Sequence, residues 1–293
     1  MNLVKFKGQL NKQTILELNK QLDNLGYVVL ENFLSYDVVN NAREAMKKLV
    51  DRSAAALQAV GKAGSLFAEA PFETRLYCLY KDHLDIAPKS FRNELHCAEL
   101  YGLFFHRGLL DFVENIIGSE LRLYPNYTAR PKFPEWAGTQ VLWHQDAGYT
   151  ESTKADSNES VESLRMLNVW TPLVPATKEN GCMQFVPGSH KLGLVAHEGD
   201  LHYLRIADDV LLTRVPEPID VEMQPGDVVL FNNLLFHQGQ PNLSKEIRWS
   251  IDWRYQDATQ STQRENQGHI ARSRVKPVAA VQSDKQWAEL SFR

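Results

Sequence analysis

The sequence lacks a cysteine framework, an excess of basic residues and a long apolar run, and each absence excludes a class of protein. Its three cysteines, Cys78, Cys97 and Cys182, are widely spaced and odd in number, which argues against disulfides or a zinc site. The 36 acidic residues outnumber the 32 Lys and Arg, so we expect no nucleic-acid partner. No stretch reaches the roughly 18 apolar residues of a membrane span, and MNLVKFKGQLNK lacks the apolar core of a signal peptide. We therefore expect a cytoplasmic protein without a membrane partner.

The chain does have enough apolar residues for a full core. Of its 293 residues, 43% are hydrophobic and 10% are aromatic, which is too many for a disordered chain. Length alone allows one large domain or two small ones. Because we find no internal repeat and no low-complexity linker, we expect a single domain over residues 1–293.

The first part of the chain, to about residue 118, has mainly helical patterns. Apolar residues recur at helical spacing from Thr14 to Leu25, and Gly26 is a natural stop. A short β run follows, and Ser35 can then cap a second helix. Apolar spacing from residue 109 to 117 predicts another helix, ended by Gly118.

From about residue 120 to 260 the pattern changes to short strands separated by Pro, Gly, Asn and Asp. The predicted strands are LRLYPNYT, QVLWHQD, RMLNVWTPLV, CMQFVPG, DVVLFNNLLFHQG and EIRWSIDWRY. Many short strands of this kind favour a sandwich or a barrel over a βαβ sheet. The expected fold class is therefore mainly β with flanking helices.

Three side chains form a candidate metal site. His144 and Asp146 are two residues apart in WHQDAGY, so on a strand they would point to the same face. His237 ends a strongly apolar run, where a histidine needs a partner for its ring nitrogens. Two histidines and one carboxylate leave one face of the metal open, which is the arrangement of non-haem Fe(II) oxygenases.

Arg248 is the candidate anchor for an anionic cosubstrate. A hairpin turning at Pro241 would bring it back beside the strand of His237. Alternation places Arg248 and Ser250 on the face that points into the barrel, where an unpaired guanidinium is costly. A dicarboxylate would pair with it, and Ser250 could add a hydroxyl contact. The alternative is an internal salt bridge, for example with Asp252.

Several segments together resemble one known family, the phytanoyl-CoA dioxygenase family. The resemblance covers roughly residues 20–280 and keeps the order of the family's motifs: GYVVLENFLS, WHQDAGY, VWTPLVPATKENGCMQFVPGSHK, QPGDVVLFNNLLFHQGQPN and RWSIDWRYQ. It implies a double-stranded β-helix, a jelly-roll or cupin-like core with outer helices. It also implies an enzyme that uses Fe(II), 2-oxoglutarate and O2 to hydroxylate or otherwise oxidise a small-molecule metabolite, forming succinate and CO2.

The resemblance also assigns roles to individual residues. His144, Asp146 and His237 match the iron ligands, and Arg248 with Ser250 matches the pair that holds the distal carboxylate of 2-oxoglutarate. The other matches are Trp170, which lines the cosubstrate pocket or lies in the barrel core, and Tyr127 and Lys132, which lie near the cosubstrate. Family members that halogenate replace the carboxylate of the HxD motif with a small residue. Because Asp146 is present, we expect a hydroxylase or desaturase rather than a halogenase.

Some alternatives stay open from the sequence alone. A cupin-like metal protein without 2-oxoglutarate turnover, either an isomerase or a ligand-binding module, would need the triad but not Arg248. The polar segment 148–163 is either a lid or a long surface loop. It leans acidic, whereas a CoA carrier would need a basic patch near the mouth of the pocket.

Overall fold

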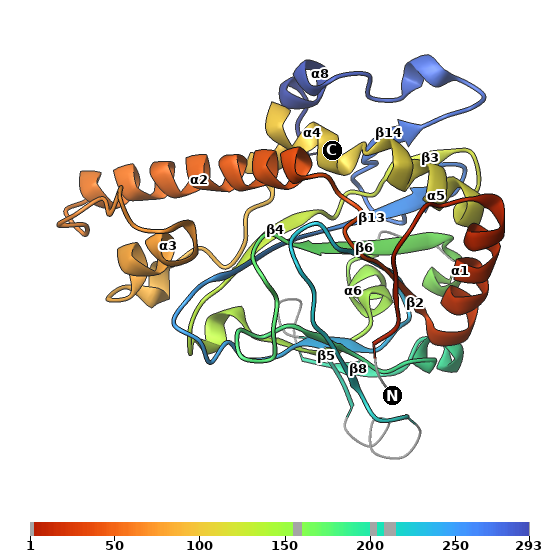
Figure 1. Cartoon of the computed structure of the whole chain (residues 1–293), viewed down its shortest axis with the longest axis horizontal. Coiled ribbons are helices and arrows are strands. Elements are labelled where there is room, and N and C mark those ends of the chain that lie inside the picture. Colours follow the sequence, from red (N-terminus) through yellow and green to blue (C-terminus); the bar gives the residue numbers. More distant parts are fainter. Residues whose placement is uncertain (1–2, 155–159, 200–203, 208–214, 293) are drawn as a thin grey trace.

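Two facing β-sheets form the centre of the protein (Figure 1). The computed structural model describes residues 3–154, 160–199, 204–207 and 215–292. The larger sheet runs in the order β1-β2-β11-β6-β13-β3-β14, with β4 also paired to β13, and the smaller runs β10-β7-β12-β5. This arrangement confirms the expected jelly-roll core with flanking helices.

The strands are short except in the middle of the larger sheet. Those of the larger sheet are β1 (Lys5–Phe6), β2 (Tyr27–Leu30), β3 (Leu121–Leu123), β4 (Thr128–Lys132), β6 (Met166–Pro172), β11 (Val228–Asn232), β13 (Arg248–Asp257) and β14 (His269–Arg272). Those of the smaller sheet are β5 (Val141–His144), β7 (Met183–Phe185), β10 (Ile219–Val221) and β12 (His237–Gly239). A separate pair is formed by β8 (His197–Glu198) and β9 (Arg205–Ile206).

The N-terminal helices cover the outer face of the larger sheet, while one short helix lies between the two sheets (Figure 1). The covering helices are α1 (Lys12–Leu25), α2 (Tyr36–Ala59), α3 (Phe72–Tyr80), α4 (Ala98–Phe104) and α5 (Arg107–Ile117). The helix between the sheets is α6 (Asp146–Ser152), and α8 (Asp284–Glu289) packs beside α4. Of the helices in the described residues, none combines the length and apolar character needed to cross a bilayer.

Helix ends follow the local sequence signals. Helix α1 begins two residues before the predicted Thr14 and ends at Gly26, whose φ of 82° is favourable only for glycine and whose N–H donates to the carbonyl of Leu22. At the start of α2, the side chain of Ser35 accepts from the N–H of Val38, as expected. These caps fix where each helix meets the sheet.

The central strand β13 separates the core from the interior of the barrel. On its outer face Trp249 is fully buried and stacks on Phe72 and Phe91, with ring centroids 5.5 and 6.1 Å away. Trp253, two positions beyond Ile251 on the same face, packs edge to face against Phe104, with ring centroids 5.6 Å apart. The predicted apolar face of this strand therefore packs under the helices, and its other face is free to line a cavity.

Two predicted strands are wrong, because neither is continuous. LRLYPNYT contains β3 and only the first residue of β4. DVVLFNNLLFHQG is also interrupted. It divides into β11 in the larger sheet and β12 in the smaller sheet. Between them the chain turns: the side chain of Asn232 accepts from the N–H of Leu234, and the backbone carbonyl of Asn232 accepts from Leu235. The turn carries His237 from one sheet to the other.

The expected hairpin between His237 and Arg248 is also wrong. Strand β12 pairs with β5 and β7, whereas β13 pairs with β4, β6 and β3. Arg248 therefore lies on the sheet opposite His237, and its direct neighbour in the ladder is Lys132 on β4. The two residues face each other across the interior instead of lying side by side.

We expect Trp249→Ala to lower the free energy of unfolding by about 3–5 kcal/mol, because it removes the side chain stacked between two rings and leaves a cavity. Urea unfolding followed by circular dichroism measures this change. The matched control is Tyr36→Ala, since Tyr36 is 80% exposed and its loss should change stability by no more than about 0.5 kcal/mol. Equal effects of the two substitutions would contradict this assignment of the core.

Candidate active site

His144, Asp146 and His237 converge between the sheets. One ligand atom from each lies within 4.8 Å of the others, as a metal site requires. Nε2 of His144 is 3.7 Å from one oxygen of Asp146, and Nε2 of His237 is 3.9 Å from the other. The structure thus brings together the three residues that the sequence singled out.

Backbone pairing and carbonyl groups orient both imidazoles. His144 and His237 are direct partners in the β5–β12 ladder, with ring centroids 4.0 Å apart. Nδ1 of His144 lies 2.7 Å from the carbonyl of Leu142, and Nδ1 of His237 lies 2.9 Å from that of Leu235. Because a carbonyl only accepts, each Nδ1 carries the hydrogen and each Nε2 keeps a lone pair for a metal.

Asp146 reaches the site from a helix and not from a strand. His144 is the last residue of β5, and Asp146 is the first of α6, so the predicted shared strand face is wrong although the two side chains still converge. The chain bends between them at Gln145, which is fully buried. Its amide donates to the carbonyls of Gly193 and Leu234, both at 2.8 Å, and anchors the bend.

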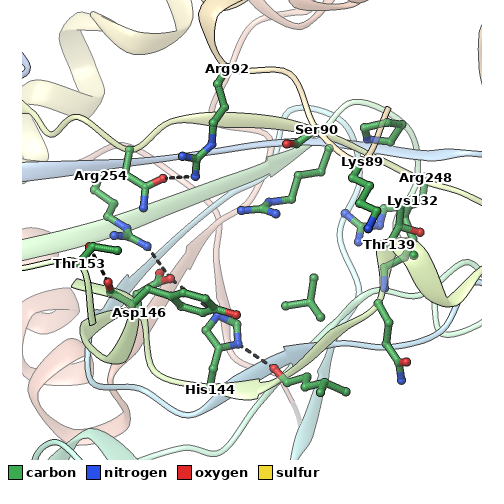
Figure 2. A pocket seen from close by; sticks show the side chains of 18 of the residues that line it. Lys89, Ser90, Arg92, Lys132, Thr139, His144, Asp146, Thr153, Arg248 and Arg254 are labelled. Carbon is green, nitrogen blue, oxygen red and sulfur yellow. Dashed lines mark hydrogen bonds and ion pairs between the residues drawn. The ribbon is translucent and has the colours of Figure 1, made fainter. Parts of the chain in front are cut away.

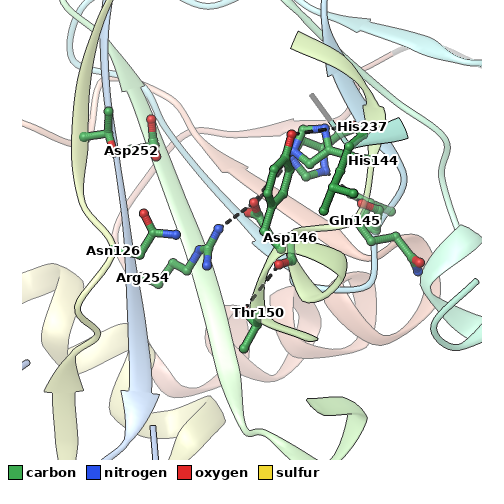
Figure 3. A network of polar contacts seen from close by, with 12 residues as sticks. Asn126, His144, Gln145, Asp146, Thr150, His237, Asp252 and Arg254 are labelled. Atoms are coloured by element: carbon green, nitrogen blue, oxygen red, sulfur yellow. Dashed lines mark hydrogen bonds and ion pairs between the residues drawn. The ribbon is translucent and has the colours of Figure 1, made fainter. Parts of the chain in front are cut away.

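Arg254 holds the carboxylate from the opposite sheet. Its Nη2 donates to Oδ1 of Asp146 at 2.6 Å (Figure 3). Burial would raise the pKa of Asp146, but Arg254 and the two imidazoles outweigh it and keep the pKa below its ordinary value. Burial, followed by the nearby His144, lowers the pKa of His237 to about 3. A charged carboxylate and a neutral imidazole are the forms that bind a divalent metal.

Arg248 lies in the interior without an acidic partner among the described residues. It is 4% exposed, its Nη1 donates to the hydroxyl of Ser250 at 2.6 Å, and its Nε has no partner. Asp252, the alternative partner considered from the sequence, pairs with Arg130 instead. Burial lowers the pKa of Arg248 to about 10, so the guanidinium stays charged at neutral pH. A buried, unpaired guanidinium of this kind suits an anionic cosubstrate.

Trp170 and Lys132 lie on either side of Arg248. Trp170 is a buried core residue whose ring centroid is 5.4 Å from the guanidinium carbon, so it supports Arg248 by a cation–π contact. Lys132 donates to the backbone carbonyls of Gly239 and Gln240. Burial and the neighbouring Arg248 lower the pKa of Lys132 to about 6.

Tyr127 lies in a different environment from the one that the family resemblance implied. Its side chain is fully buried in the core beneath the helices, where its hydroxyl is 3.0 Å from Nε2 of His96 and its ring packs on Phe292. It does not line the cavity that contains the triad. Its position does not support contact with a cosubstrate.

A cavity of about 690 Å³ extends from His144 and Asp146 to Arg248 (Figure 2). Leu142 and Tyr149 line it. Asp146 is the only acidic residue among the described lining residues. Seven basic residues line it as well: Lys89, Arg92, Arg130, Lys132, Arg248, Arg254 and Arg264.

Comparison with known proteins identifies the family. Residues 22–250 match the family model described as phytanoyl-CoA dioxygenase (PhyH). The chain belongs to the phytanoyl-CoA dioxygenase family. As a PhyH-family member with this triad, it is a non-haem iron- and 2-oxoglutarate-dependent dioxygenase, which confirms the function and the cofactors expected from the sequence.

The similarity to individual relatives extends over most of this PhyH-family chain. A 1-deoxypentalenic acid 11-beta-hydroxylase from Streptomyces arenae is 26% identical over 257 residues, spanning 83% of this chain and 81% of the relative. Among solved structures, EctD from S. alaskensis with 2-oxoglutarate and 5-hydroxyectoine has a TM-score of 0.60 at 20% identity, covering 94% of this chain and 85% of its own. The non-heme monooxygenase ThoJ has a TM-score of 0.58 at 21% identity, covering 92% and 90%. These structural likenesses show the shared fold.

The sequence did not predict how basic the oxygenase cavity is. The acidic-leaning segment 148–163 suggested that no basic patch lies near the mouth of the pocket. This expectation is wrong, because seven basic residues line the cavity. The segment forms α6 and a turn at Val161–Ser163, while residues 155–159 lie outside the described part of the chain. Alternation along TARPK could have shown that Arg130 shares a face with Lys132, but Arg92 and Arg264 come from distant segments.

We expect Arg254→Gln to weaken Fe(II) binding about 10–100-fold, because residues that orient a metal ligand commonly have effects of this size. Anaerobic titration with Fe(II) measures the affinity. Arg165→Gln is the matched control, since Arg165 also pairs with an aspartate of β13, Asp257, but does not line the cavity. Unchanged iron affinity in Arg254→Gln would show that Arg254 does not position Asp146.

Proposed function

We propose that this PhyH-family dioxygenase acts as a single domain over residues 1–293 and hydroxylates a small-molecule substrate. The cavity supports a small molecule, because about 690 Å³ lies within the usual range of ligand pockets. The similarity to a hydroxylase of comparable length supports hydroxylation. The observation that carries the proposal is that His144 and Asp146 of the triad line one cavity with a buried Arg248 that has no acidic partner among the described residues.

The residues have distinct roles in this proposal. His144, Asp146 and His237 hold the iron through Nε2, a carboxylate oxygen and Nε2. Arg248, oriented by Ser250 and Trp170, pairs with the distal carboxylate of 2-oxoglutarate, and Lys132 adds an amino group at that end. When bound, iron and 2-oxoglutarate supply the oxidising chemistry, consuming O2 and releasing succinate and CO2.

The protein's own residues hold the metal ligands in position and limit the access of water to them. Arg254 and Gln145 fix Asp146 so that its carboxylate faces both imidazoles. The aromatic ring of Tyr149, 5.3 Å from that of His144, limits access of water to one side of the site. A carboxylate at position 146 leaves no room for a halide in place of that ligand, so we propose oxygen insertion and not halogenation.

Labelled oxygen tests this proposal most directly. The enzyme with Fe(II) and 2-oxoglutarate is screened over a panel of small metabolites, with succinate as the readout. For any compound that stimulates succinate formation, we expect a reaction under ¹⁸O2 to place one labelled atom in succinate and one in the product, because both atoms of O2 are used. Added chloride should give no chlorinated product.

Two results would contradict the proposal in different ways. A product that has lost two hydrogens without gaining label would replace hydroxylation by desaturation while leaving the dioxygenase assignment intact. Tight iron binding without succinate from any compound, or from 2-oxoglutarate alone, would favour the alternative of a metal-binding protein without turnover.

A further inference from the structure

Basic residues extend along the cavity well beyond the place for 2-oxoglutarate. In the β4–β13 ladder, Lys132 is opposite Arg248, Arg130 is opposite Ser250, and Thr128 is opposite Asp252. At about 3.3 Å per residue, positions two and four residues farther along β4 lie roughly 7 and 13 Å from Lys132. Figure 2 shows Arg248 and Lys132 together on one side of the cavity, apart from Arg92 and Arg254.

Two arginines at this second end have no acidic partner among the described residues. Within the described part of the chain, the guanidinium of Arg92 donates only to neutral side-chain atoms, from Nε to the hydroxyl of Thr128 at 3.1 Å and from Nη2 to the amide oxygen of Asn126 at 2.8 Å. Arg264 lies over the ring of Tyr124, 5.6 Å from its centroid, and its Nε is buried without a hydrogen-bond partner. Both side chains line the cavity.

The nearby carboxylates are already engaged. Asp252 pairs with Arg130 at 2.6 Å, and Asp146 pairs with Arg254 at the same distance. Asp146 also serves as an iron ligand in the proposed function. Iron(II) adds two positive charges and 2-oxoglutarate adds two negative ones, so the cofactors leave the positive excess of the cavity unchanged.

The guanidinium groups are close enough to repel one another. Burial, together with Arg130, Arg254 and Arg264, lowers the pKa of Arg92 to about 10, while Asp252 opposes this shift. Arg130 nevertheless keeps 40% of its side chain exposed, because it borders the cavity. An anion in the cavity would relieve this repulsion and could reach the groups without moving the backbone.

We propose that Arg92, Arg130 and Arg264 form a distal anion site that binds one carboxylate or phosphate group of the substrate. This inference rests on the proposed function, and it narrows the substrate to an anionic small molecule. Fork-shaped guanidinium groups suit the two or three oxygens of such a group. The anion anchors one end of the substrate, while 2-oxoglutarate occupies the Arg248 end.

Calorimetry on the anaerobic complex with Fe(II) and one equivalent of 2-oxoglutarate tests the distal anion site, because excess 2-oxoglutarate would itself compete for a carboxylate site. The probes are inorganic phosphate and cyclohexanecarboxylate, with cyclohexanecarboxamide as the uncharged control. We expect one anion to bind per chain, the amide not to bind, and Arg92→Gln or Arg264→Gln to weaken anion binding about tenfold, the effect of losing one charge-assisted hydrogen bond. The probe that binds more tightly shows whether the site prefers a phosphate or a carboxylate group.

Further variants separate loss of the site from loss of the fold. Arg92→Lys keeps the charge and should retain more anion binding than Arg92→Gln. Arg165→Gln, which removes an arginine outside the cavity, should not change the affinity for either probe. In each sample the visible charge-transfer band of iron-bound 2-oxoglutarate reports whether the metal centre is intact.

The outcomes distinguish this inference from the proposed function. A band in every variant together with anion binding that depends on Arg92 and Arg264 supports both. A band in every variant with anion affinity unchanged by Arg92→Gln and Arg264→Gln, or with no anion binding by the wild type, overturns the distal anion site alone. Absence of the band from the wild type overturns the proposed function and this inference with it.

Discussion

The alternation of side chains along β13 is the constraint on which the rest of the structure depends. One face of the strand carries Trp249, Ile251 and Trp253 into the core beneath the helices. The other face carries Arg248 and Arg254 into the cavity, six residues apart. Because the period of a strand is two, these roles cannot be exchanged, and a slip of one residue would bury the charges under the helices. The strand therefore places three features together: the tryptophans of the core, the proposed cosubstrate anchor Arg248, and Arg254, which holds the carboxylate of Asp146.

The two-sheet arrangement explains how so much positive charge is kept inside a protein whose net charge is negative. The smaller sheet presents the two imidazoles from paired strands, and the larger sheet presents arginines from β13 and β4 across from them. Burying a cation without a partner costs free energy, and a bound anionic ligand can offset that cost. In this chain Arg254 pairs with Asp146 and Arg130 pairs with Asp252, whereas Arg248 has no acidic partner among the described residues.

Local patterns predicted much of this structure, and long-range pairing accounts for what they missed. The caps at Gly26 and Ser35 could be read directly, since each depends on a few neighbouring residues, whereas the triad was found from residue types and the order of the family's motifs. The division of DVVLFNNLLFHQG between two sheets could not, because the apolar run is compatible with one strand until the turn at Asn232 is known. Pairing of β13 with β4 involves residues more than a hundred positions apart, so local patterns could not predict that arginines from distant segments share one cavity.

The central claim is that the triad and Arg248 together hold iron and 2-oxoglutarate. Anaerobic addition of Fe(II) and then 2-oxoglutarate to the purified apoprotein tests it, by the weak visible charge-transfer band of the chelate. The account predicts a band in the wild type, no band in His237→Ala, and a band in Arg248→Ala only at much higher 2-oxoglutarate concentrations. A wild type that binds iron tightly but shows no band, or a band that is unchanged by both substitutions, would contradict it.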